Sequence, residues 1–202
     1  MAAPETGPAG RRAIDESRIE AAVAELLLAI GEDPSREGLS ETPRRIAEAY
    51  RELFAGIGAD PLEHLADTIA TAPGELGELV LLRDIAFRST CEHHLLPFTG
   101  VAHLAYIPGS RTVGLGKLPR VVETLSSRPQ LQERLTEEIA DALQQGLDPL
   151  GVLVVLDAVH GCVTARGSRQ ARSSTVTMAT RGVLRDPLAR SEAMTLIGRA
   201  DD

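Results

Sequence analysis

Residues 78–107 read ELVLLRDIAFRSTCEHHLLPFTGVAHLAYI and are the most informative part of the chain. Two apolar runs, Glu78–Phe87 and Val101–Ile107, have the length and composition typical of strands. Between them stands RSTCEHHLLPFTG, whose proline and glycine indicate a turn. The sequence therefore predicts a β-hairpin whose connection carries a thiol, a carboxylate and two imidazoles.

The rest of the chain alternates helical and strand patterns. Apolar residues recur at helical spacing over 15–30, 42–55, 117–125, 131–147 and 186–197, and residues 151–159 and 173–180 form strand-like runs. Residues 1–13 read as a flexible tail and 57–76 as a connector. This order predicts an α+β fold, an antiparallel sheet with helices on one face, whose other face oligomerisation could cover.

Composition limits the functions open to the chain. With 202 residues it suits one compact domain with a substantial core. The formal charge of −8, the aromatic content of 2% and the absence of Trp argue against nucleic acid as a partner. The sequence has no apolar run long enough for a membrane span and no secretory pattern, so we expect a cytoplasmic protein with no membrane partner.

Two short clusters hold the candidate chemistry. The only cysteines, Cys91 and Cys162, lie at the ends of expected strands and close to histidines. In a reducing compartment such cysteines are more often metal-binding or reactive than disulfide-bonded. We expect Cys91, His94 and Cys162 to hold a catalytic zinc, which leaves His93 and His160 to carry protons. A closed structural zinc site and two ordinary buried cysteines are the alternatives.

A second group of residues suits an anionic ligand. Lys117, the only lysine, and Arg120 are one helical turn apart, and Arg166 follows the second cysteine closely. Such cations can bind an anion near the metal. Each alone is better explained as a solvated surface charge, and their nearness in sequence to the two clusters favours a shared pocket. Gln132 and Glu133 open a helix, where an acid suits the helix dipole, and a carboxylate can also accept two hydrogen bonds from a guanine edge. The residue types leave these alternatives open.

Seven segments match a known family in order and spacing: ETPRRIAEAY, STCEHHLLPF, AYIPGSRTVGLGKL, RPQLQERLTEEIA, DAVHGC, ARG and SSTVT. Through them the chain resembles GTP cyclohydrolase I over about residues 15–198. The resemblance implies the tunnelling fold (T-fold), in which subunits join their sheets into rings and rings stack into a homodecamer with active sites between subunits. It also implies one domain over 14–202, with N-terminal helices at 15–56 and a catalytic region at 77–198.

The resemblance implies a reaction and a role for each residue. GTP and water give 7,8-dihydroneopterin triphosphate and formate, the first step of tetrahydrofolate and pterin biosynthesis, with attack at C8 of guanine. Zinc would be the only cofactor, held by Cys91, His94 and Cys162, while His93 and His160 move protons. The implied substrate-binding residues are Glu133 and Gln132 at the guanine edge, Lys117, Arg120 and Arg166 on the triphosphate, and Arg45 from a neighbouring subunit.

Three positions depart from the commoner family pattern. Gly116 removes a hydroxyl expected near the phosphates, Gly161 replaces a bulkier residue and predicts looser packing at the metal loop, and Glu48 stands where some members carry a cation. We expect an active enzyme with weakened substrate affinity. A specialised pterin or deazapurine pathway enzyme is one alternative. A non-catalytic purine-binding scaffold is another, and it fits poorly with two complete Cys and His clusters.

Overall fold

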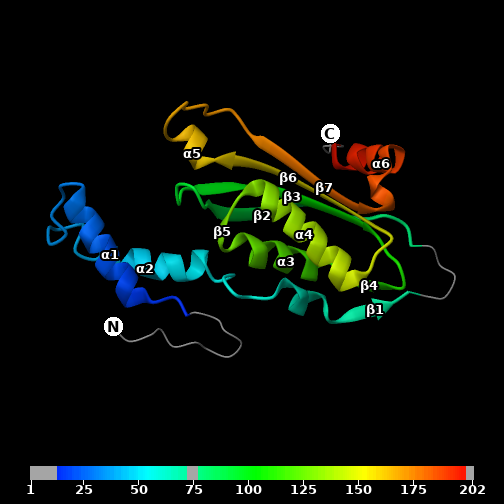
Figure 1. Ribbon diagram of the computed structural model, residues 1–202, viewed down its shortest axis with the longest axis horizontal. Coiled ribbons are helices and arrows are strands. Elements are labelled where there is room, and N and C mark those ends of the chain that lie inside the picture. Colours follow the sequence, from blue (N-terminus) through cyan, green and yellow to red (C-terminus); the bar gives the residue numbers. More distant parts are fainter. Residues whose placement is uncertain (1–12, 72–76, 199–202) are drawn as a thin grey trace. The chain divides into compact units, whose positions relative to one another are not determined.

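The computed structural model describes residues 13–71 and 77–198 (Figure 1). The chain divides into an N-terminal unit, residues 1–59, and a C-terminal unit, residues 60–202. The tail expected at 1–13 lies, except for its last residue, outside the described part. Among the helices of the described part, none combines the length and the apolar character needed to cross a membrane.

Two helices make up the described N-terminal unit, as the apolar spacing predicted. α1 (Glu16–Ala29) begins after Asp15, whose carboxylate accepts a hydrogen bond from the backbone N–H of Arg18 at 3.0 Å. This cap satisfies one of the free donors at the helix start. α2 (Thr42–Leu53) has Pro43 in its first turn, where the missing N–H of proline costs no hydrogen bond.

The C-terminal unit is built on a five-stranded sheet in the order β5-β2-β3-β6-β7. These strands are β2 (Val80–Cys91), β3 (Pro97–Ile107), β5 (Pro129–Gln130), β6 (Gly151–His160) and β7 (Thr175–Gly182). Neighbours are antiparallel, except that β5 runs parallel to β2. The hairpin expected within residues 78–107 is confirmed as β2 and β3. A separate small sheet pairs β1 (Thr68–Ala70) with β4 (Arg111–Val113), and a short 3-10 helix, η2 (Pro61–Leu65), precedes it.

Helices α3 (Lys117–Ser126) and α4 (Gln132–Leu147) cover one face of the sheet (Figure 1). Their apolar sides bury alternate residues of the central strands, such as Leu104 and Val154. The intervening residues face the other way, where Leu153 packs against η3 (Val183–Arg185) and α6 (Pro187–Gly198). The expected α+β sheet with helices on one face is confirmed, and α6 adds partial cover on the second face.

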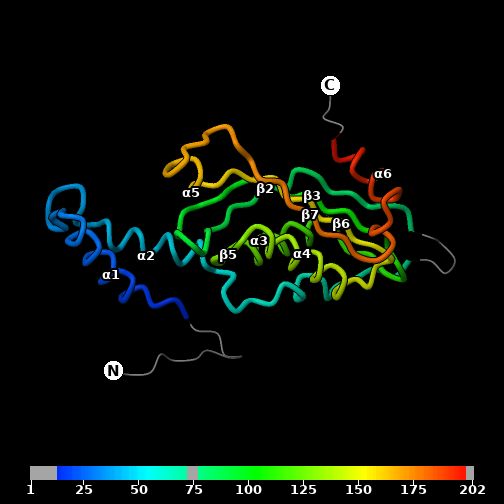
Figure 2. The backbone as a smooth tube through the Cα atoms, turned by 45° about the horizontal axis from the view of Figure 1, so that its top comes forward, coloured from blue at the N-terminus to red at the C-terminus, as the bar shows by residue number. Residues whose placement is uncertain are grey.

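Both chemical clusters lie at the same end of the sheet. β2 ends at Cys91, β3 begins at Pro97, and β6 ends at His160, which pairs in register with Phe98. The short helix α5 (Gly161–Thr164) follows β6 at this end. Helix α6 lies at the opposite end, because β7 finishes beside the start of β6 (Figure 2).

Candidate active site

The connection between β2 and β3 is a tight turn that presents two possible metal ligands. The backbone N–H of Leu95 donates to the carbonyl of Cys91 at 2.8 Å, and the N–H of Cys91 donates to the carbonyl of Leu96 at 2.9 Å. Leu95 has a φ of 52°, a left-handed conformation that a leucine adopts only where its surroundings impose it. The turn leaves Cys91 buried and His94 exposed.

The end of β6 brings the second cysteine to the same place. At Gly161 a Cβ atom would lie 2.8 Å from the carbonyl oxygen of Pro97, so the two backbones are in close contact. The expectation of looser packing at Gly161 is therefore wrong. Beyond this contact, the ligand atoms of Cys91, His94 and Cys162 all lie within 4.8 Å of one another. The structure thus brings the three expected ligands together.

The chemistry of this group fits a metal ion. Both cysteines are free thiols. Burial raises the pKa of the Cys162 thiol and the neighbouring Cys91 raises it further, while the charge of Arg166 lowers it. Two adjacent thiolates need a compensating cation, which a bound metal provides. Two sulfur donors and one imidazole can hold a tetrahedral metal and leave a fourth position for water.

His160 is held firmly beside this group. Its ring stacks on Phe98, with centroids 4.6 Å apart and planes 5° apart, and its Nε2 lies 2.6 Å from Oε1 of Gln132. Burial lowers the pKa of His160, and the charge of Glu133 opposes this effect. The imidazole is therefore neutral near pH 7 and can accept a proton.

Gln132 is buried at the start of α4, and its side-chain amide has several partners within the chain. Nε2 lies 2.8 Å from the carbonyl oxygen of Thr175, 3.1 Å from the hydroxyl of Thr177 and 3.2 Å from the carbonyl oxygen of Leu156. Its Oε1 faces His160. Both amide hydrogens are thus taken up by groups of the chain itself.

An ion pair joins α4 to the metal turn, the connection between β2 and β3 that carries Glu92, His93 and His94. Glu92 and Arg134 are linked by two N···O contacts of 2.6 and 3.1 Å, and this hydrogen bonding lowers the pKa of Glu92. Sequence reasoning missed Arg134, because its 42-residue separation from Glu92 gives no local signal. His93 in the same turn is exposed, with its ring centroid 6.2 Å from that of His94, and Glu133 is exposed at the start of α4.

The expected cations do not all gather at this end of the sheet. Arg166 is exposed, and its charge acts on Cys162. Lys117 and Arg120 lie at the start of α3, whose other end leads into β5 beside Cys91. A rise of 1.5 Å per residue sets Lys117 about 14 Å from that end of the helix. Within one chain, the length of α3 therefore separates Lys117 from the end of the helix near Cys91, and about 9 Å of the same helix separates Arg120 from it.

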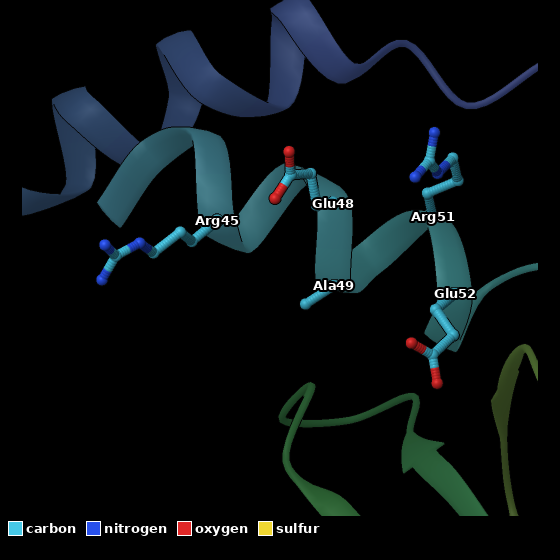
Figure 3. A pocket seen from close by; sticks show the side chains of 5 residues that line it. All are labelled: Arg45, Glu48, Ala49, Arg51 and Glu52. Carbon is cyan, nitrogen blue, oxygen red and sulfur yellow. The ribbon is translucent and has the colours of Figure 1, made fainter. Parts of the chain in front are cut away.

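Arg45 lies on α2 in the N-terminal unit and is exposed (Figure 3). On the same helix Glu48 pairs with Arg44, with an N···O distance of 2.6 Å. Glu48 thus offsets the charge of a neighbouring cation on α2.

The family model and the curated relatives agree with each other. Residues 19–198 match the model of the GTP cyclohydrolase I family. GTP cyclohydrolase 1 of Leifsonia xyli subsp. xyli is 59% identical over 184 residues, which cover 91% of this chain and 96% of that protein. The corresponding protein of Carboxydothermus hydrogenoformans is 54% identical over 187 residues, which cover 92% and 96%. A solved structure of an archaeosine synthase QueF-Like in the apo form matches 54% of this chain and 97% of its own, with 17% identity and a TM-score of 0.45.

Proposed function

The chain belongs to the GTP cyclohydrolase I family, and we propose that it opens the guanine ring of GTP at a zinc ion held by Cys91, His94 and Cys162. The reaction converts GTP and water into formate and 7,8-dihydroneopterin triphosphate. One observation carries the proposal: three ligand atoms from two separate strand ends lie within 4.8 Å of one another.

Zinc fits the donor set better than the common hard cations do. Thiolate and imidazole ligands favour zinc, whereas magnesium and calcium favour oxygen ligands. Three protein ligands also leave the open position of a catalytic site. Zinc bound there supplies a nucleophile for C8 of guanine, because it lowers the pKa of a coordinated water to near neutrality.

The two histidines outside the ligand set are assigned to proton transfer. His160 is neutral near pH 7, and its stacked ring keeps it in a fixed orientation. His93 is exposed in the turn next to His94, where it can exchange protons with substrate and solvent. Positioned acids and bases of this kind contribute about 10²- to 10⁴-fold to a rate.

Glu133 is assigned to guanine recognition. It is exposed in the first turn of α4, and its charge acts on His160, so it lies near the proton-transfer group. A carboxylate with two acceptor oxygens matches the N1–H and N2 amino donors of guanine. This pair of donors distinguishes guanine from adenine, so Glu133 gives the site its base preference.

A second copy of the chain completes the triphosphate site in this proposal. Arg166 lies near the metal ligands of its own chain. Lys117 and Arg120 lie in the half of α3 that is far from the metal ligands and are assigned to the site of a neighbouring subunit, as is Arg45. Long cationic side chains at a subunit boundary suit a triphosphate, which offers many acceptor oxygens.

The surface of the C-terminal unit supports assembly. Among residues 13–71 and 77–198, β7 has a strand neighbour on one side only. Val159, Val176 and Met178 are between 43% and 60% exposed. Open strand edges and exposed apolar side chains are commonly covered by another subunit. By the resemblance to the family, we assign 77–198 to the ring-forming catalytic region of a homodecamer and 15–56 to an N-terminal extension. Two free thiols side by side also support a reducing compartment, the cytoplasm.

The test is formate release from GTP by the purified, assembled protein. We expect formate and the fluorescent oxidised pterin to appear together, to disappear after chelation, and to return with zinc. A structural zinc site predicts instead that chelation dissociates or unfolds the protein. Absence of both products from zinc-loaded decamer would contradict the proposal and favour a purine-binding scaffold.

A further inference from the structure

The contacts of Gln132 determine which way its amide points. Nε2 faces the carbonyl oxygens of Thr175 at 2.8 Å and Leu156 at 3.2 Å. A carbonyl oxygen only accepts hydrogen bonds, so the group that faces both must be the amide nitrogen. A flipped amide would set its oxygen against two oxygens. The orientation therefore follows from the hydrogen bonds and is not an arbitrary assignment.

This orientation in turn determines where His160 carries its proton. Oε1 of Gln132 lies 2.6 Å from Nε2 of His160, and an amide oxygen only accepts. Nε2 of His160 must therefore be the donor. In a neutral imidazole the lone pair then lies on Nδ1.

We propose that Gln132 is a positioning residue that holds His160 in the Nε2–H tautomer and leaves Nδ1 as the acceptor nitrogen of the ring. The inference rests on the proposed function, in which His160 carries protons.

The surroundings of the contact suit this role. Phe98 stacks on the ring and fixes its plane, and Gln132 fixes its rotation within that plane. Gln132 is 1% exposed, so water does not compete for its amide. The Thr177 hydroxyl that contacts Nε2 of Gln132 is itself 2.7 Å from the hydroxyl of Thr136. The orienting amide is thus supported by α4, β6 and β7 together.

Gln130 provides a matched control two residues earlier. It is also 1% exposed, and its Nε2 donates to the carbonyl oxygen of Leu125 at 3.1 Å and to Glu138 at 2.8 Å. Its side chain has the same chemistry and burial, with partners other than the histidine. Methionine is close to glutamine in length and volume, so Gln132→Met and Gln130→Met each replace a buried amide, and only the first removes a contact to His160.

The tautomer can be measured without turnover. Solid-state NMR of zinc-loaded protein with 15N-labelled histidine distinguishes protonated from unprotonated ring nitrogens. The signals of His160 are identified by their loss in His160→Asn. We expect a protonated Nε2 and an unprotonated Nδ1. The opposite tautomer would overturn the inference and leave the proposed zinc reaction standing, because the latter is tested separately by formate release.

Kinetics separate positioning from guanine binding. In Gln132→Met we expect kcat to fall about 10- to 100-fold, the scale of losing an orienting partner, with KM for GTP within about twofold. Gln130→Met should stay within about threefold of the wild type, since it leaves His160 untouched. A raised KM with unchanged kcat would overturn the inference, as would equal losses in both variants. If Gln132→Met does not assemble, the wild-type spectrum alone decides.

Discussion

The two parts of the proposed site are built in different ways. The metal ligands and His160 lie at adjoining strand ends, where strand register, ring stacking and a buried amide fix their positions. The proposed triphosphate residues lie at the surface of helices and loops, and Lys117 begins a helix whose other end is near the metal turn. The metal ligands and His160 form the fixed part of the site, which lies within one chain. The proposed triphosphate residues form the dispersed part, a set of cations that lie far apart along the chain.

This difference matches what each part must do. Bond making and breaking depend strongly on the geometry of the reacting atoms, so catalytic groups need rigid support. Charge attraction to a triphosphate falls off slowly with distance and tolerates long, flexible side chains. In the proposed site the catalytic groups therefore come from one chain, whereas anion binding can be shared between subunits. Variants that alter only the fixed part or only the dispersed part can separate the contribution of catalysis from that of triphosphate binding.

The largest effect is expected from Cys162→Ser, which removes one ligand of the fixed part. Without zinc the attacking water keeps a pKa far above neutrality, so formate release should fall at least about 10³-fold. The zinc content per chain, measured by mass spectrometry, should fall together with the rate of formate release. His64→Gln is the control, because His64 contacts Thr124 through its Nε2 and a glutamine amide can keep that hydrogen bond. Full zinc occupancy in an inactive Cys162→Ser protein would show that this thiol is not a ligand.

A mixing experiment tests whether the second part comes from another subunit. Lys117→Ala and Cys162→Ser should each give low activity alone. Co-expressed with different tags and purified as mixed oligomers, they should regain about a quarter of wild-type activity. Each restored site needs an intact metal cluster from one chain and an intact lysine from its neighbour. Mixed oligomers no more active than the single variants would place Lys117 and the metal in the same chain.

The metal end of the fold was predictable because its signals are local. The strand runs, the turn between them and the clusters at their ends can all be read from the sequence, and hairpin pairing brings strand ends together. The His160–Gln132 contact was not predictable in this way. It depends on where α4 lies across the sheet, and the pattern of apolar residues gives only the face of a helix, not its lengthwise position.

Two positions show what sequence spacing leaves open. Lys117 lies between the two clusters in the sequence, and α3 carries it about 14 Å from the metal end of its own chain. Gly161 was expected to loosen packing, but its lack of a side chain allows two backbones to touch. Neither distance can be obtained from the sequence, because each depends on how the helices and strands that carry these residues are placed.

Gly161→Ala tests how tightly the fixed part is packed. The added methyl would meet the carbonyl oxygen of Pro97 at 2.8 Å, so we expect a loss of about 1–3 kcal/mol of stability. Thermal unfolding of the zinc-loaded protein measures this loss. Gly116→Ala is the control, because its Cβ would have no neighbour within 4 Å, and we expect a change within about 0.5 kcal/mol. Equal melting temperatures for the two variants would contradict the close packing.

The smallest effect is expected in the dispersed part, from Gly116→Ser. Gly116 precedes Lys117 at the start of α3 with a φ of −64°, a backbone conformation that serine adopts without strain. The new hydroxyl can donate one hydrogen bond to a phosphate oxygen, so KM for GTP should fall about 2- to 10-fold while kcat stays constant. Gly116→Ala separates the hydroxyl from a change in helix propensity. An equal fall in KM for alanine and serine would mean that a stiffer helix start, and not a phosphate contact, limits affinity at this position.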